Sequence, residues 1–285
     1  MLGAHQEVSM AVLEVSRAVP LLRKEYREGR LVPFLGAGFS KPLNLPDWGE
    51  LIADMARRLG FEPDLFTLHG DFEQLAGYFE EAGDFEYLVH EMTRGFNSAE
   101  SEKARRTSRT HQALAALRWH TLYTTNFDFH VEGALRDAGR AVNVLASFSD
   151  FQGPREPGGC DVIKFHGTLE KRSTIVLTEK AFFDRMALEA PPDQRLRADL
   201  LSHSFLFIGY SFSDTNIRYI WHRMHQLRKG SGPGTAASPR KCFFATHGAG
   251  PVQPALLEKW NIDIIQLDPA DKSASVADLL QRIGA

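Results

Sequence analysis

Short apolar runs alternate with segments long enough to form helices along most of this 285-residue chain. The runs of strand length lie at residues 31–35, 121–125, 142–145, 162–165, 174–177, 205–208, 242–245 and 262–267. Alternation of this kind is typical of strand–helix–strand units, in which parallel strands are buried between helices. We therefore expect an α/β fold with a mostly parallel sheet and helices on both faces. Its ligand cleft would lie at the carboxyl ends of the strands.

Two segments outside this pattern predict helical additions to the sheet. Residues 1–30 have apolar side chains at helical spacing and are interpreted as an N-terminal helical segment. Residues 61–109 show three-and-four spacing with little strand signal, which predicts a helical insert or small subdomain. The core would then comprise residues 31–60 and 110–285. Within it, Pro33 predicts an irregular, edge-like first strand. Asp47 is a candidate cap for a helix that continues to about Leu59.

Charge and cysteine content limit the classes of function. The 33 basic and 36 acidic residues give a net charge of −3, so we expect no direct, sequence-specific binding of nucleic acid. Cys160 and Cys242 are too few for a disulfide framework or a four-thiolate zinc site, which favours a reducing, cytoplasmic location and no metal. No apolar run approaches the roughly 20 residues of a spanning helix, so we expect no membrane association.

Polar or glycine-rich residues directly follow four of the predicted strands. They occur at residues 36–40, 125–128, 166–168 and 209–214. The carboxyl ends of parallel strands share one edge of a sheet, so these four loops would converge there. This convergence predicts a functional site more strongly than any single motif does.

The first of these loops contains Gly36 and Gly38, which match the opening of a dinucleotide-binding fingerprint. Lys41 occupies the third glycine position, and the glycine–lysine–serine end of a P-loop is absent. Two interpretations remain open. The turn lets backbone N–H groups approach a pyrophosphate, or its glycines serve only to reverse the chain.

Two other loops carry side chains with useful chemistry. Asn126 has an amide that can hold ribose hydroxyls or a water, although an asparagine in a turn is also a common structural residue. His166 follows an apolar run and could accept a proton, or it could be a hydrogen-bonded structural histidine. Asp128 is a candidate helix cap that could also contact a ribose. No histidine pair has metal-ligand spacing.

Taken in order, five motifs resemble the sirtuin-like superfamily, specifically its bacterial branch of NAD-consuming, anti-phage defence proteins. The motifs are GAGFS (36–40), LPDW (45–48), TTNFD (124–128), FHG (165–167) and GYSFSD (209–214), and the resemblance spans about residues 31–268. It implies a Rossmann-like sheet that carries NAD+ as substrate. It also implies an essential asparagine and histidine, which would be Asn126 and His166.

The resemblance implies positions for the remaining NAD+-binding residues as well. It places them near the pyrophosphate (Gly36, Ala37, Gly38 and Ser40), the nicotinamide (Asp47 and Trp48) and the adenosine half (Gly209 and Ser211), with Thr125 and Asp128 completing the set.

Departures from protein-deacylating sirtuins indicate the reaction. Those enzymes usually carry a four-cysteine zinc module and a Phe-Gly-Glu segment after the histidine, and this sequence has neither. We therefore expect an NAD+ glycohydrolase that releases nicotinamide and ADP-ribose and so depletes NAD. Two alternatives stay open: a non-hydrolytic module that senses NAD or ADP-ribose, and an NAD-dependent protein deacylase.

An enzyme that destroys a central cofactor needs control, and the resemblance implies how it is exerted. The family precedent is an effector that works beside a protein handling nucleic acid, such as a translocase ATPase or an Argonaute. We expect a homo-oligomer regulated by assembly with such a partner. The regions 1–29 and 61–109 are candidate contact surfaces, although packing within the chain would explain them equally well.

Overall fold

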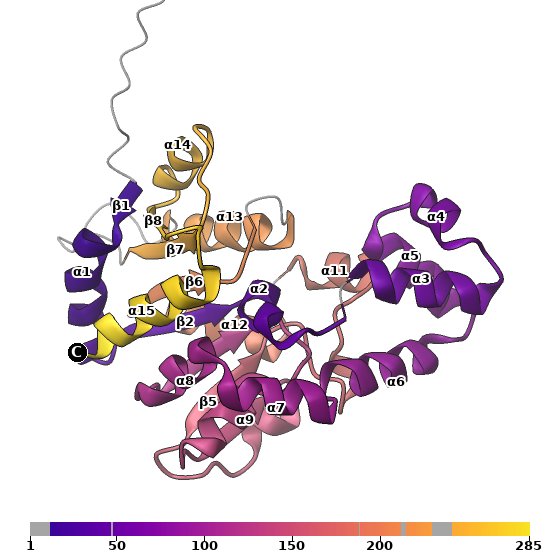
Figure 1. Cartoon of the computed structure of the whole chain (residues 1–285), viewed down its shortest axis with the longest axis horizontal. Helices are drawn as coiled ribbons and strands as arrows, with labels where there is room; N and C mark the ends of the chain where they lie inside the picture. Colours follow the sequence, from indigo (N-terminus) through magenta and orange to yellow (C-terminus); the bar gives the residue numbers. More distant parts are fainter. Residues whose placement is uncertain (1–11, 47, 188, 212–214, 230–240) are drawn as a thin grey trace, which may run out of the picture.

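The computed structural model describes residues 12–46, 48–187, 189–211, 215–229 and 241–285 (Figure 1). Within these ranges the chain forms an eight-stranded sheet whose paired strands are all parallel, in the order β1-β8-β7-β6-β2-β3-β5-β4. The strands are β1 (Val12–Glu14), β2 (Leu31–Leu35), β3 (Thr121–Thr124), β4 (Val142–Leu145), β5 (Cys160–Lys164), β6 (Ser204–Ile208), β7 (Cys242–Thr246) and β8 (Ile262–Gln266). The predicted parallel α/β sheet is confirmed.

The order of the strands reverses around β2. After β2 the chain builds β3, β4 and β5 on one side, and it then returns to build β6, β7 and β8 on the other side. In open parallel sheets, such a reversal opens a crevice at the carboxyl ends of the strands, where ligands bind. The topology therefore places the candidate site at the carboxyl ends of β2 and its neighbours.

Helices cover both faces of the sheet, as predicted. Alternate residues of β2 point to opposite faces: Leu31 and Leu35 pack into one core, and Val32 and Phe34 into the other. The first core contains side chains of α1 (Val15–Arg27), α8 (Arg109–Ala116), α9 (His130–Asp137) and α15 (Lys272–Gly284). The second contains side chains of α12 (Pro191–Asp199), α13 (Thr215–Lys229) and α14 (Gln253–Glu258).

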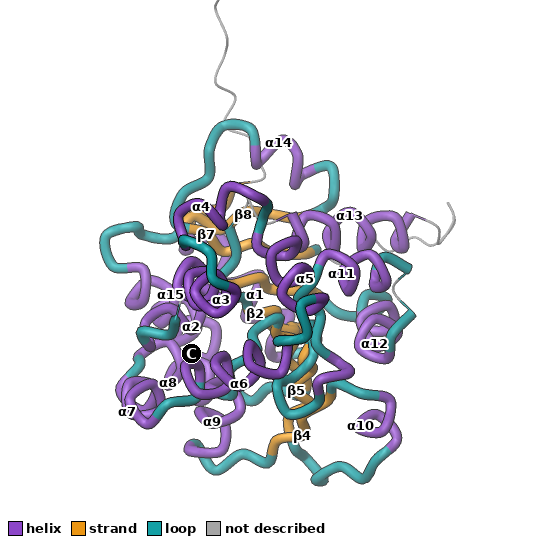
Figure 2. The backbone as a smooth tube through the Cα atoms, turned by 90° about the vertical axis from the view of Figure 1, so that its right-hand side faces the viewer, coloured by secondary structure: helices purple, strands orange, loops and turns teal. Residues whose placement is uncertain are grey.

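A helical lobe projects from the carboxyl edge of the sheet (Figures 1 and 2). It consists of α3 (Trp48–Leu59), α4 (Pro63–Phe66), α5 (Phe72–Glu81) and α6 (Phe85–Phe96), which share an apolar cluster of their own. Phe127 and Leu169, from the loops after β3 and β5, belong to the same cluster. The lobe therefore includes α3, from before residue 60, and the boundaries of the insert remain a prediction.

Short elements complete the chain. Between α6 and α8 lies α7 (Ala99–Thr107), whose Arg105 forms an ion pair with Asp137 of α9. The remaining elements are α2 (Ala37–Ser40), α10 (Phe148–Gln152), α11 (Glu179–Arg185) and the 3₁₀ turns η1 (Lys41–Leu43), η2 (Thr67–His69) and η3 (Arg172–Thr174). No helix of the described residues is long and apolar enough to cross a bilayer.

Three local expectations differ from the structure. The strand predicted at residues 174–177 is wrong: η3 ends at Thr174, and the Val176 N–H donates to the His166 carbonyl at 2.8 Å, which folds this segment over a site loop. Pro33 lies in a central strand, not an edge strand, and pairing with β3 begins only at Phe34, one residue beyond it. Residues 12–14, predicted to be helical, form β1 against β8.

Aromatic side chains stack on the central strands β2, β3 and β6, next to the edge of the sheet at which the site loops begin. The Phe34 ring is fully buried and stacks on Tyr123 and Phe207, with ring centroids 5.3 and 5.2 Å away. Aromatic side chains contribute large buried areas, so this stack stabilises the three strands that carry the central site loops.

We expect Phe34→Ala to lower the free energy of unfolding by about 3–5 kcal/mol, since it removes buried area and leaves a cavity. Denaturant unfolding followed by circular dichroism measures this loss. Phe148→Ala is the control: Phe148 is 64% exposed, and its substitution should change stability by less than about 0.5 kcal/mol. Similar losses in both variants would contradict a stabilising role for the stack.

Candidate active site at the carboxyl edge of the sheet

The four loops singled out in the sequence do converge. Leu35 of β2 pairs in register with Ile208 of β6 and Thr124 of β3, and Thr124 pairs with Lys164 of β5. These four residues are the last of their strands, so the loops leave the sheet side by side. The structure thus places the segments that carry Asn126 and His166 on neighbouring strands.

The glycines of the first and fourth loops allow their backbones to touch. The Gly36 N–H donates to the Ile208 carbonyl at 2.9 Å, and the Gly38 N–H donates to the Gly209 carbonyl at 2.8 Å. A Cβ atom on Gly36 would lie 2.7 Å from that same Gly209 carbonyl oxygen. Both N–H groups are therefore used within the protein. Within this loop, Ala37 and Gly38 are exposed.

Tyr210 lies across this glycine contact and was not singled out in the sequence. Its hydroxyl donates to the Leu35 carbonyl at 2.9 Å and lies 3.0 Å from the Thr125 hydroxyl. A Cβ on Gly36 would lie 2.6 Å from the Tyr210 ring, so the glycine makes room for it. Thr125, predicted to bind NAD+, is thereby tied to the fourth loop. The sequence signal that could have identified Tyr210 was its place between the predicted site residues Gly209 and Ser211.

The Asn126 side chain is held by the first loop. Its amide nitrogen donates to the Gly36 carbonyl at 3.2 Å and to the Ser40 hydroxyl at 3.1 Å, while Asn126 is 7% and Ser40 1% exposed. The amide oxygen is buried and has no hydrogen-bond partner in the described part of the chain. A buried acceptor without a partner is costly. The arrangement therefore fixes the amide nitrogen and leaves the oriented amide oxygen without a partner within the described residues.

Asp128 lies directly before Phe129, which is the N-cap residue of α9, so Asp128 is not itself the predicted helix cap. Its carboxylate accepts a hydrogen bond from the His130 N–H at 3.0 Å, at the start of α9, and Asp128 is 4% exposed. The Asp128 carbonyl accepts from the Lys164 ammonium at 2.5 Å. Contact of Asp128 with a ribose remains a prediction.

The His166 imidazole is partly buried among aromatic rings. Phe182 of α11 meets it edge-on, with ring centroids 5.2 Å apart and an interplanar angle of 84°. Burial, together with the smaller effect of the nearby Arg185 guanidinium, lowers the pKa of His166 to about 3. At neutral pH the ring is therefore uncharged.

Arg185 holds the strand end that carries His166. Its guanidinium donates to the Phe165 carbonyl at 2.9 Å, and the charge is balanced by an ion pair with the buried Asp193. Burial raises the pKa of Asp193, while Arg185 opposes that shift. The sequence offered no spacing signal for Arg185 or Phe182, because both reach the site from a helix 16 or more residues after His166.

Other predicted site residues are placed only in part. Asp47 lies outside the described residues, and Trp48 is described only as the first residue of α3. Ser211 is exposed in the loop after β6. Their roles at the nicotinamide and adenosine remain predictions. Among the described residues, no group of three or more His, Cys, Asp or Glu side chains could hold a metal ion.

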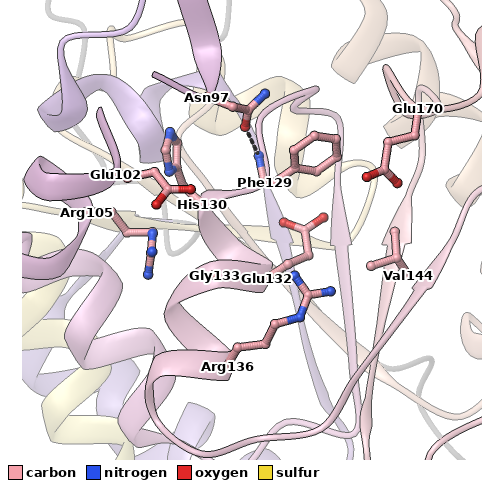
Figure 3. Close-up of a pocket in the computed structure, with 10 residues that line it drawn as sticks. All are labelled: Asn97, Glu102, Arg105, Phe129, His130, Glu132, Gly133, Arg136, Val144 and Glu170. Atoms are coloured by element: carbon pink, nitrogen blue, oxygen red, sulfur yellow. Dashed lines mark hydrogen bonds between the residues drawn. The ribbon is translucent and has the colours of Figure 1, made fainter. Parts of the chain in front are cut away.

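A cavity of about 250 Å³ lies beside the first turns of α9 (Figure 3). Its lining includes Phe129, Glu132 and Arg136 around α9, and Asn97, whose amide oxygen accepts from the Phe129 N–H at 2.9 Å. None of the predicted site residues lines this cavity. It is therefore separate from the residues expected to bind NAD+.

Comparison with known proteins identifies the family. A family model described as a SIR2-like domain matches residues 120–265, which is just over half of the chain and includes both Asn126 and His166. The chain belongs to the SIR2-like family. The sirtuin-like resemblance seen in the sequence motifs is thus confirmed.

Curated relatives of this SIR2-like chain are longer proteins. The NAD(+) hydrolase ThsA of Cytobacillus dafuensis is 30% identical over 242 residues, which covers 84% of this chain and 46% of ThsA. The Bacillus cereus (strain MSX-D12) protein of the same name is 29% identical over 208 residues, covering 70% of this chain and 41% of that protein. Defense-associated sirtuin 2 of Bacillus subtilis is 22% identical over 279 residues, covering 93% of this chain and 27% of that protein. The chain spans less than half the length of these relatives.

A solved structure shows the same fold. The crystal structure of a Sir2 homologue in complex with NAD superposes with a TM-score of 0.53 at 16% sequence identity, covering 94% of this chain and 93% of that chain. At this identity the likeness supports the Rossmann-like fold of the SIR2-like chain and nothing finer.

We expect Gly209→Ala to destabilise the protein and weaken its site. Gly209 has φ +82°, and a Cβ there would lie 2.4 Å from the Phe39 nitrogen. Gly139→Ala is a matched control, because Gly139 has φ +73° but no heavy atom within 4 Å of a Cβ. The Gly139→Ala variant should lose only about 1–2 kcal/mol of stability, which is the cost of the left-handed backbone conformation for alanine. Thermal unfolding measures the stability of both variants. A loss of stability in Gly209→Ala no larger than in Gly139→Ala would contradict the close loop contact.

Proposed function

We propose that this SIR2-like chain hydrolyses NAD+ at the bond between nicotinamide and ribose, releasing nicotinamide and ADP-ribose. The observation that carries the proposal is the pairing of Asn126, with one oriented and unpartnered amide oxygen, and an uncharged His166 on the next strand. The names of the relatives from Cytobacillus dafuensis and Bacillus cereus support NAD+ as the substrate.

In this reaction the main task of the protein is to position the substrate and the attacking water. Nicotinamide leaves as a neutral base with the electron pair of the broken bond, and the transition state resembles an oxocarbenium ion. A water oxygen then bonds to the anomeric carbon and gives up a proton. In this proposal Asn126 accepts a hydrogen bond from the nicotinamide ribose or the attacking water, and His166 orients the ribose hydroxyls and accepts the proton before passing it to solvent.

The proposed biological role is NAD depletion in bacterial anti-phage defence. The name of the Bacillus subtilis relative, defense-associated sirtuin 2, supports a defence role. Assembly into a homo-oligomer and control by a partner that handles nucleic acid belong to the same proposal. The relatives contain about as much sequence again beyond the region matched here, or more, which is where such control could be built.

We expect Asn126→Ala and His166→Ala each to lower the rate of nicotinamide release by about 10² to 10⁴-fold, because each removes positioning or proton transfer. Chromatographic quantification of nicotinamide from NAD+ measures the rate. His90→Ala, which changes an exposed histidine of α6, should leave the rate unchanged.

The same assay separates the alternatives. Undiminished release from both variants would refute the site assignment. Binding of NAD+ without any release by the wild-type chain, alone or assembled, would favour a sensing module. Consumption of an acetyl-lysine peptide in proportion to NAD+ would instead indicate a deacylase.

The pH profile tests the state of His166. For a histidine with the ordinary pKa of about 6.5, the neutral fraction would fall about 25-fold between pH 7 and pH 5. The pKa of His166 is lowered to about 3, so its neutral form persists through this range. We expect kcat/KM for NAD+ to fall by less than about threefold from pH 7 to pH 5, in protein that circular dichroism shows to be folded. A fall of about 25-fold would contradict the lowered pKa.

A further inference from the structure

A buried ion pair connects the two segments that carry the proposed catalytic residues. Lys164, the last residue of β5, is fully buried, and its ammonium lies 3.1 Å from a carboxylate oxygen of Glu132 on α9. The Glu132 side chain is only 1% exposed. Lys164 is two residues before His166, and Glu132 is six residues after Asn126. The pair therefore spans from one site segment to the other.

Lys164 also contacts the Asn126 segment directly. Its ammonium donates to the Asp128 carbonyl at 2.5 Å and lies 5.3 Å from the centre of the Phe129 ring. Thr124, the residue at which β3 ends, pairs in register with Lys164. Three contacts with residues 128–132 thus radiate from one charged group. We propose that Lys164, held by Glu132, is a positioning residue that sets the Asn126 loop relative to the strand that carries His166.

The energetics of buried ions favour this role over simple stabilisation. Removing two charges from water is costly, and replacing a buried ion pair with apolar side chains of similar volume is often neutral or stabilising. An apolar pair would fill the space between β5 and α9. It would lack the directional hydrogen bond to the Asp128 carbonyl, which fixes where the loop lies.

The surroundings of Glu132 agree with this role. Neither of its carboxylate oxygens has a hydrogen-bond partner among the described residues, and its contact with the Lys164 ammonium is an ion pair. Glu132 lines the 250 Å³ cavity, between Phe129 and Arg136 in Figure 3. Glu132 is therefore left with one strong contact, to Lys164, that orients the ammonium toward the loop.

The inference rests on the proposed NAD+ hydrolysis, and a pair of variants separates positioning from folding. Lys164→Met leaves Glu132 buried and uncompensated, so we expect a large fall in melting temperature. Lys164→Met combined with Glu132→Leu removes both charges, and we expect the melting temperature to return close to that of the wild type. In this double variant kcat for nicotinamide release should remain at least about tenfold below wild type, with KM changed by less than about threefold.

Two further variants complete the comparison. Glu132→Gln keeps an amide in place of the carboxylate, and we expect a lower kcat because the ammonium loses its anchor. Lys241 forms an ion pair with Asp263 at the other end of the sheet, with 2.8 Å between the charged atoms. Lys241→Met removes this ion pair and should leave kcat unchanged. Wild-type kcat in the double variant, or in Glu132→Gln, would overturn the proposal.

Amide hydrogen exchange tests the same inference without relying on catalysis. Without NAD+, we expect residues 124–131 of the double variant to exchange at least about tenfold faster than in the wild type, and residues 242–266 to be unaffected. Equal exchange in both proteins would overturn the positioning role. If the wild type releases no nicotinamide, the proposed function fails by itself, and the exchange result still decides whether Lys164 positions the loop.

Discussion

The close contact between two backbone turns, at Gly36 and Gly38 on one side and Gly209 on the other, is the constraint on which the site depends. The turns follow β2 and β6, the two strands at which the sheet reverses its order. Because no side chain separates the two turns, the Gly36 carbonyl lies where it can accept a hydrogen bond from the Asn126 side-chain amide. The orientation of Asn126, which follows β3, is therefore set by backbone packing between the turns after β2 and β6, and not by its own loop alone.

Much of this architecture was predictable because the signals are local. Buried parallel strands read as continuous apolar runs, and seven of the eight predicted strands are present. The failure at residues 174–177 has a tertiary cause: Val176 is buried and bonds to the His166 loop, and Leu177 is buried in the apolar cluster of the helical lobe. The three residues of β1 were too few for any periodic signal, and only their pairing with β8 defines them as a strand.

The site was predictable at the level of loops and less so at the level of contacts. Asn126 and His166 stood out because polar residues followed apolar runs. Arg185 did not, since its effect on the pKa of His166 comes from a separate helix that sequence spacing does not place. One of the two interpretations of the glycines was that they offer N–H groups to a ligand, but the N–H groups of Gly36 and Gly38 bond within the protein. A glycine pattern specifies close approach, and only the fold decides what approaches.

The apolar cluster of the helical lobe has a consequence for cooperativity. Phe127 lies next to Asn126 and Leu169 lies three residues after His166, and both are buried in that cluster together with α3, α5 and α6. Any opening that separates the lobe from the sheet must therefore expose both side chains to water. Lobe and site thus share one local unfolding equilibrium, so that a ligand bound at the sheet edge and a contact that stabilises the lobe would protect the same amides.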